Sequence, residues 1–297
     1  MGRFDTTSET GDMKYRLLGL DLDGTLLDDR GRVSRANRDA LARAEEAGLK
    51  VVPCTGRGWR ESRDVLGDLP GLDIGVFVTG AAVVSLPEGT AVDLSIIEPH
   101  LAMEITEFLA TEPEAVLVYR EPGLAGYDYL VTGQGELNAS TEWWFKQSRA
   151  TVHFQNRIDL ESMHHALRIG LVAEARRLPE LSQRLAKHFG DRVLLHHFEV
   201  FQQDGPNASI HVLEVFAAGT DKWRGLSWIA QERGIPAEEI AAIGDSVNDL
   251  SMLEQAGCGI AMRNASDDAR RCARCVTEAN THDGVARAID RLLDGTW

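Results

Sequence analysis

Four aspartates in two groups have spacings that suit acid–base and metal chemistry. Asp21 and Asp23 stand two positions apart at the end of an apolar run, so an extended chain projects both side chains to one side. Asp245 and Asp249 lie four positions apart with Asn248 between them, and a hard divalent cation prefers such carboxylate and amide oxygens. Either group alone could equally consist of helix-capping residues. Their function therefore depends on the residues that accompany them.

A lysine supplies the opposite charge. Only five of the 31 basic residues are lysines, and Lys222 begins a predicted helix, where a cation opposes the helix dipole. A compact ammonium suits a phosphoryl group. The four aspartates and Lys222 together leave three net negative charges, so an anion would enter only with a cation such as Mg2+, which bridges carboxylate and phosphate oxygens. These residues therefore predict Mg2+-dependent phosphoryl transfer.

The elements that must position these residues alternate between strands and helices. The predicted strands are residues 15–20, 49–54, 74–78, 240–243, 259–262 and 275–277. Segments with apolar residues at helical spacing separate them, which is typical of a parallel sheet covered by helices. In such sheets ligands bind beyond the carboxyl ends of the strands. Because Asp21, Thr55, Thr79 and Asp245 each follow a predicted strand, we expect them to converge.

The middle of the chain interrupts this alternation. Residues 85–216 hold eight of the nine histidines and several Pro/Gly turns, although their pattern is still that of a mixed α/β segment. We therefore predict a discontinuous core domain formed by residues 13–84 and 217–297, with an α/β domain inserted at 85–216. The polar residues 1–12 predict a flexible leader.

Length and charge exclude several classes of function. A chain of 297 residues fits about two folding units. Its net charge of −15 would repel nucleic acid and anionic membranes, and no run approaches the ~18 apolar residues of a membrane span. Four scattered cysteines and the lack of an apolar signal segment favour a cytoplasmic location. Nothing in the sequence predicts an oligomeric state.

Taken in order, these residues resemble the four motifs of haloacid dehalogenase (HAD) superfamily phosphatases. The motifs are Asp21 to Thr25, Thr55 with Gly56 and Arg57, Lys222, and Gly244 to Asp249. The long insertion after the third core strand resembles the Cof-type branch of that superfamily. The resemblance implies a Rossmann-like parallel-sheet core with an inserted α/β cap of the C2 type.

The resemblance also implies a role for each motif residue. Asp21 would attack phosphorus and form an aspartyl-phosphate, while Asp23 would exchange protons with the leaving group and the attacking water. Thr55 and Lys222 would hold the oxygens of the transferring phosphoryl group. The implied substrate-binding residues are Thr55, Gly56, Arg57, Lys222 and Asn248. The implied Mg2+ ligands are Asp21, the main-chain carbonyl of Asp23, Asp245 and Asp249, the last either coordinating directly or, with Asn248, orienting the others.

Two positions depart from the pattern of the branch. Thr79 with Gly80 replaces an Asn-Gly pair, which leaves open a second contact to phosphate, and Trp223 replaces a glycine and could narrow the entrance. The leading hypothesis is a Mg2+-dependent phosphatase of a small phosphorylated metabolite, either a sugar phosphate or a phosphorylated cofactor. Two alternatives stay open: a phosphosugar mutase, which would return phosphate to the sugar, and a non-catalytic sensor of a phosphorylated ligand.

Overall fold

The computed structural model describes residues 13–148, 150–200 and 210–297, so the predicted leader at residues 1–12 lies outside the described residues. The described chain forms two compact units, which are considered one at a time.

The two units draw on separate stretches of the sequence. The first comprises the chain up to residue 51, residues 69–71 and residues 230–297, and the second comprises residues 52–68 and 72–229. The domain boundaries after residues 84 and 216 stay a prediction. No helix among the described residues is long and apolar enough to cross a membrane.

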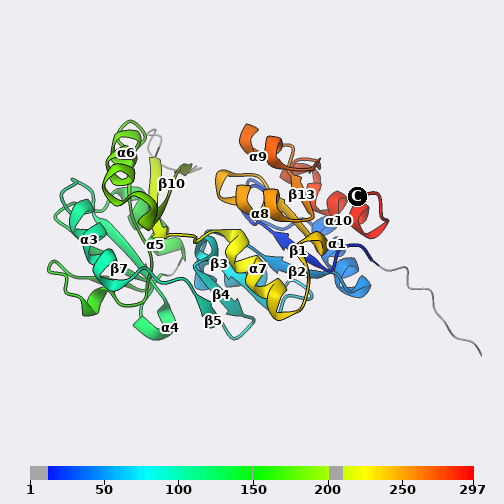
Figure 1. Ribbon diagram of the computed structural model, residues 1–297, viewed down its shortest axis with the longest axis horizontal. Helices are drawn as coiled ribbons and strands as arrows, with labels where there is room; N and C mark the ends of the chain where they lie inside the picture. The colour runs from blue at the N-terminus through cyan, green and yellow to red at the C-terminus, as the bar shows by residue number, and fades with distance from the viewer. Residues whose placement is uncertain (1–12, 149, 201–209) are drawn as a thin grey trace, which may run out of the picture. The chain divides into compact units, whose positions relative to one another are not determined.

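A five-stranded sheet forms the centre of the first unit (Figure 1). Its order is β14-β13-β12-β1-β2, with bounds Leu17–Leu20 (β1), Lys50–Pro53 (β2), Ile240–Gly244 (β12), Cys258–Ala261 (β13) and Cys275–Val276 (β14). The neighbours β1 and β12, β12 and β13, and β13 and β14 pair in parallel. Every residue of β1, β12 and β13 is buried, as expected where both faces of a parallel sheet are covered. The predicted parallel-sheet core is thereby confirmed.

Helices cover this sheet. Those of the first unit are α1 (Arg35–Ala47), α8 (Leu250–Gln255), α9 (Asp267–Cys272) and α10 (Gly284–Leu293). Helices α1 and α10 pack against each other, and α8 packs on β12, β13 and α9. Local sequence sets the ends of α1: the Ser34 side chain accepts a hydrogen bond from the Asn37 N–H, and Gly48 closes the helix with a φ of 85°. The predicted helix between the first two strands therefore has the expected cap at each end.

The second unit contains a three-stranded antiparallel sheet of β3 (Ile74–Phe77), β4 (Ala82–Ser85) and β5 (Thr90–Leu94). The sequence placed β3 in the parallel sheet, whereas in the described residues its parallel pairing is a single bridge between Cys54 and Val76. The reason is the tight 3-10 turn Val78–Gly80, which reverses the chain so that β4 pairs with β3 directly.

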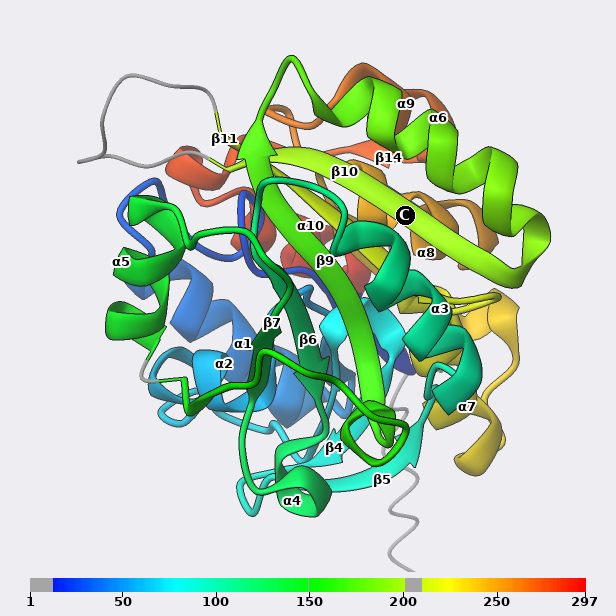
Figure 2. The same ribbon diagram turned by 90° about the vertical axis from the view of Figure 1, so that its left-hand side faces the viewer.

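A six-stranded sheet of order β10-β11-β9-β6-β7-β8 makes up most of the second unit. Its strands are β6 (Val116–Arg120), β7 (Tyr129–Thr132), β8 (Val152–Phe154), β9 (Ala166–Glu174), β10 (Val193–Val200) and β11 (Ile210–Ala217). All neighbours are antiparallel except β7 and β8. Helices α3 (Pro99–Leu109) and α6 (Leu178–Phe189) lie along this sheet (Figure 2), and Ile105 and Leu185 share one apolar core with Ile169 and Val215. The remaining helices are α2 (Trp59–Leu66), α4 (Pro122–Ala125), α5 (Ala139–Ser148) and α7 (Lys222–Glu232).

Candidate active site

Three predicted site residues of the first unit lie together, and we call them the carboxylate cluster: Asp21, Asp245 and Asp249. One carboxylate oxygen from each lies within 4.8 Å of the other two. Asp21 follows β1 and Asp245 follows β12, and because these strands are parallel neighbours their carboxyl ends meet at one edge. The strand order of the sheet therefore brings the two motifs together.

Hydrogen bonds orient the carboxylates within the cluster. The Thr25 hydroxyl donates to Oδ1 of Asp245 over 3.2 Å. Oδ2 of Asp249 accepts from the N–H groups of Asp245 (3.0 Å) and Ser246 (2.9 Å). Gly24 has a φ of +76°, and a Cβ at this position would lie 2.4 Å from Oδ2 of Asp245. The turn after β1 therefore packs on Asp245 so closely that a side chain would displace it.

The chemistry of these donors suits a metal ion. Asp21 and Asp249 are buried and Asp245 is half-buried, so three like charges lie close together with limited access to water. Such a group is unfavourable unless a cation or protons compensate the charge. A set of ligands made up only of oxygen atoms favours a hard divalent cation. The carboxylate cluster can therefore hold a metal ion.

The other two predicted residues of this unit lie beside the cluster in sequence but differ in exposure. The Asp23 side chain is exposed, and Asn248 is half-buried in the 3-10 turn Val247–Asp249. The loop that carries Asp23 is tied to the C-terminal segment, because Nδ2 of Asn264 donates to the Gly24 carbonyl over 2.8 Å. Asn264 in turn accepts from the Asn280 N–H over 2.9 Å. The C-terminal segment therefore fixes the loop that follows β1.

In the second unit, Thr55 is buried in a loop held by backbone hydrogen bonds. Its N–H donates to the Val76 carbonyl (2.9 Å), and its own carbonyl accepts from the Thr79 N–H (3.0 Å). The Val78 N–H donates to the Arg57 carbonyl over 2.9 Å, and the Arg57 N–H donates to the Thr55 hydroxyl over 3.1 Å. The loop that begins at Thr55 and the turn after β3 thus form one hydrogen-bonded unit.

The turn after β3 is strained. Val78 and Thr79 have φ values of 50° and 55°, a region that β-branched residues rarely adopt. The Thr79 hydroxyl is buried and makes no hydrogen bond within the described residues. At Gly80, where φ is +95°, a Cβ would lie 1.8 Å from the Asp221 carbonyl oxygen. Only glycine therefore lets this turn approach the start of α7.

Lys222 begins α7 and has no solvent-exposed surface. A Cβ built on Gly80 would lie 3.1 Å from the backbone nitrogen of Lys222. The Thr55 carbonyl accepts from the Thr79 N–H, so Thr55 and Lys222 both lie next to the turn Val78–Gly80. Trp223, the next residue, is half-buried. The second unit thus groups Thr55, Gly56, Arg57 and Lys222. Their expected convergence with the aspartates stays a prediction.

Sequence reasoning did not single out Arg168 and Glu214, which form a buried ion pair next to the Thr55 loop. Burial raises the pKa of Glu214 above its ordinary value, although the Arg168 charge opposes that rise. A signal for both was present, because each is a lone charge between two apolar residues of a strand. On a buried strand such a charge requires a partner.

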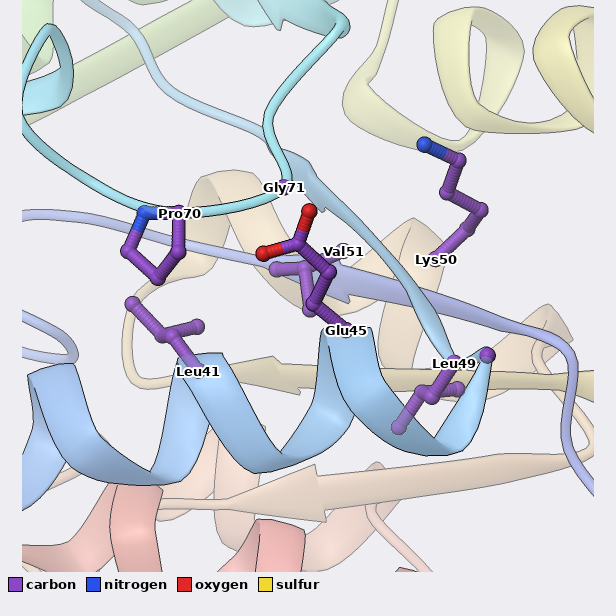
Figure 3. Close-up of a pocket in the computed structure, with 8 residues that line it drawn as sticks. Leu41, Glu45, Leu49, Lys50, Val51, Pro70 and Gly71 are labelled. Carbon is purple, nitrogen blue, oxygen red and sulfur yellow. The ribbon is translucent and has the colours of Figure 1, made fainter.

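The first unit also contains a pocket of about 110 Å3 (Figure 3). It is formed where α1 ends and β2 begins, and its lining residues are Leu41, Glu45, Gly48, Leu49, Lys50, Val51, Pro70 and Gly71. The carboxylate cluster lies instead where β1 and β12 end. The pocket therefore holds none of the predicted site residues.

Comparison with known proteins gives consistent matches over most of the chain. A family model described as haloacid dehalogenase-like hydrolase matches residues 18–289. The 5-amino-6-(5-phospho-D-ribitylamino)uracil phosphatase YwtE of Bacillus subtilis is 29% identical, over 95% of this chain and 99% of its own length. The pyridoxal phosphate phosphatase YbhA of Escherichia coli is 26% identical, over 93% of this chain and 98% of its own length. Among solved structures, a haloacid dehalogenase-like hydrolase from B. subtilis superposes with a TM-score of 0.74 at 26% identity, covering 93% of this chain and 99% of that one.

Proposed function

The chain belongs to the haloacid dehalogenase-like hydrolase family and is a phosphoric monoester hydrolase, and on this premise we propose that it is a Mg2+-dependent phosphatase acting through an aspartyl-phosphate on Asp21. The observation that carries the proposal is the carboxylate cluster, three aspartates with oxygens within 4.8 Å at the ends of parallel strands. The family resemblance inferred from the motifs is confirmed by the matches.

We propose a small phosphorylated metabolite as the substrate. The two curated relatives are named for a phosphoribityl compound and for pyridoxal phosphate, which are a sugar-alcohol phosphate and a phosphorylated cofactor. Both offer an alkyl phosphomonoester as the reacting group. A substrate of this kind fits the cytoplasmic location that the sequence predicts and requires neither nucleic acid nor membrane as a partner.

In the proposed reaction Asp21 attacks phosphorus, and the bond from phosphorus to the alkoxide leaving group breaks. Asp23 gives a proton to that leaving group and then takes one from the water that hydrolyses the aspartyl-phosphate. The exposed side chain of Asp23 supports this role, because a group that exchanges protons with a leaving group and with water must be accessible to both.

Thr55 and Lys222 bind the oxygens of the transferring phosphoryl group in this proposal. Lys222 supplies a positive charge with no exposed surface, which strengthens its attraction for an anion because little water screens it. Gly56, Arg57 and Asn248 are the further substrate-binding residues of this proposal. Positioning and charge stabilisation of this kind supply most of the catalysis in phosphoryl transfer.

The residues that would hold Mg2+ are Asp21, Asp245 and Asp249 with the main-chain carbonyl of Asp23. A bound Mg2+ stabilises negative charge that develops on the phosphoryl oxygens. Since one oxygen of Asp249 already accepts two backbone N–H groups, Asp249 also orients the loop that carries Asp245.

The test is hydrolysis of p-nitrophenyl phosphate by the wild type and by Asp21→Asn, with Mg2+ or with EDTA. Removal of the nucleophile should lower kcat by at least about 10³-fold, and EDTA should abolish wild-type activity. Asp39→Asn, the same change on the exposed face of α1, is the control and should keep full activity. Full activity of Asp21→Asn would contradict the mechanism.

Release of inorganic phosphate from a sugar phosphate separates this function from the alternatives. A phosphosugar mutase would yield an isomer of the sugar phosphate in place of free phosphate. A non-catalytic sensor would bind the ligand and leave it intact. Measuring phosphate and sugar phosphate together distinguishes all three.

A further inference from the structure

One face of the six-stranded sheet carries a group of polar residues that the proposed chemistry does not use. We call it the Arg168 cluster: Tyr129, Arg168 and Glu214 come from the sheet, and Glu61 joins them from α2. Along a strand successive side chains point to opposite faces. Ile169 and Val215 belong to the apolar core formed with α3 and α6, so Arg168 and Glu214 point to the other face.

A continuous set of hydrogen bonds runs from this face to the loop after Thr55. The Arg168 guanidinium donates to Oε1 of Glu214 (2.6 Å), to the Tyr129 hydroxyl (2.8 Å) and to the Gly56 carbonyl (3.1 Å). The Tyr129 hydroxyl donates to Oε1 of Glu61 over 3.0 Å. Oε2 of Glu61 accepts from the N–H at residue 58 over 2.8 Å. Residues 56–61 are therefore held at both ends.

The contact at Gly56 acts on Thr55 through a single rigid group. The Gly56 carbonyl and the Arg57 N–H belong to the same planar peptide unit and point in opposite directions. Arg168 holds the carbonyl end, and the N–H end donates to the Thr55 hydroxyl over 3.1 Å. Fixing the carbonyl therefore fixes the direction from which the Thr55 hydroxyl receives its hydrogen bond.

Close packing leaves this segment little freedom. A Cβ on Gly58 would lie 2.0 Å from the Tyr119 hydroxyl oxygen. The Arg168 guanidinium lies over the same Tyr119 ring, 5.3 Å from its centroid. Tyr119 is buried, so neither the ring nor the loop can move without disturbing the other.

Stability alone does not account for this pair. The side chains of Arg168 and Glu214 are only 13% and 6% exposed, and buried ion pairs are often no more stabilising than apolar residues of similar volume. The planar guanidinium, however, directs donors to three acceptors at once, which apolar residues cannot do and a lysine does poorly.

We propose that Arg168, supported by Glu214, is a positioning residue for phosphoryl binding: through the Gly56–Arg57 peptide it sets the orientation of the Thr55 hydroxyl. The inference rests on the proposed function, in which Thr55 binds the phosphoryl oxygens. It gives the six-stranded sheet a direct part in the geometry of the phosphate site.

The test compares Arg168→Met, Arg168→Lys and the wild type by inhibition with inorganic phosphate, by kcat and KM for p-nitrophenyl phosphate, and by thermal unfolding. Arg168→Met should raise the inhibition constant of phosphate and lower kcat/KM by about ten- to a hundredfold, because a misplaced binding group loses the aligned geometry. Arg168→Lys should recover part of both. Arg177→Met, which removes the ion pairs of Arg177 with Glu112 and Glu114 in the same unit, is the control and should change stability alone.

A double variant separates positioning from stability. Arg168→Met leaves Glu214 buried without its partner and should unfold at a lower temperature, whereas Arg168→Met with Glu214→Met removes both charges and should regain stability. Phosphate inhibition should stay weak in the double variant, because nothing then holds the Gly56 carbonyl.

Recovery of phosphate affinity together with stability in the double variant would overturn the inference. Unchanged phosphate affinity in Arg168→Met would also overturn the inference. If the wild type hydrolyses p-nitrophenyl phosphate, that result would leave the proposed function intact. A wild type that neither hydrolyses p-nitrophenyl phosphate nor binds phosphate would overturn the proposed function itself, and with it the inference.

Discussion

The carboxylate cluster of the first unit and the Arg168 cluster of the second hold their charges in opposite ways. Asp21, Asp245 and Asp249 bring like charges within 4.8 Å of each other, oriented by backbone N–H groups and a hydroxyl. Arg168 and Glu214 are opposite charges that pair at 2.6 Å in a buried setting. The first group can have its charge compensated by a metal ion, whereas the second satisfies its charges internally.

This contrast separates two tasks that phosphoryl transfer demands. A metal site must keep its ligands close together even though they repel one another. Part of the free energy that stabilises the folded site is therefore gained only when the ion binds. A site that positions a neutral hydroxyl must be rigid before the ligand arrives, which a paired and hydrogen-bonded group achieves. The two units should therefore respond to different ligands, the first to Mg2+ and the second to phosphate.

Among the changes that test this contrast between the two units, the largest expected loss of activity comes from Gly80→Ala in the second unit. The new Cβ would lie 1.8 Å from the Asp221 carbonyl oxygen and must displace the start of α7 with Lys222. A displacement of about 1 Å in a binding group can lower activity by about 10²-fold. We expect such a loss in kcat/KM and in phosphate affinity, with the half-saturating Mg2+ concentration unchanged.

The control for this change is Gly126→Ala. Gly126 also has a positive φ, of 81°, but a Cβ there would meet nothing within 4 Å. Gly126→Ala should therefore lower the unfolding temperature without changing the affinity for phosphate. Equal losses in both variants would show that backbone strain, and not the contact with α7, produces the effect.

The next expected effect comes from Asp245→Asn in the first unit and is measured by thermal unfolding with and without Mg2+. Mg2+ at about 100 times its dissociation constant should stabilise the wild type by about 2.7 kcal/mol. Mg2+ should not stabilise Asp245→Asn to this extent. Without Mg2+, the variant should be more stable than the wild type, because one of the three like charges is gone.

Arg168→Met serves as the contrast, since its gain from Mg2+ should match that of the wild type. An equal Mg2+ response in Asp245→Asn and the wild type would contradict the assignment of the metal to the carboxylate cluster.

The smallest effect concerns pH and Glu214. Burial raises the pKa of Glu214 in the folded protein, so its stabilising contribution is complete below the ordinary pKa of the unfolded chain and is lost as pH rises through the raised value. The stability of the wild type relative to Glu214→Gln should fall over that interval, by at most about 1.4 kcal/mol per pH unit since one proton is involved. Urea unfolding of both proteins across the mildly acidic range measures this slope. A rise in place of a fall would show that the Arg168 charge outweighs burial.

The structure brings Asp21, Asp245 and Asp249 together, and the sequence signals behind this placement are local. Asp21 and Asp245 each end an apolar run, and such runs become neighbouring parallel strands whose carboxyl ends meet. The sequence predicted where the strand at 74–78 lies along the chain, but it did not predict which strand pairs with it. Apolar periodicity shows that a strand forms, whereas the sharp turn at 78–80 decides that its partner is β4.

By itself the sequence determined the family, the parallel-sheet core, and the order of the motifs that carry the proposed chemistry. These features depend on residue types and on spacings of a few positions, which fix local conformation directly. Only the tertiary structure decided that Arg168 reaches the carbonyl of Gly56, 112 positions earlier in the chain. Such a contact depends on the register of antiparallel strands and on which sheet face a loop packs against, and no local spacing encodes either.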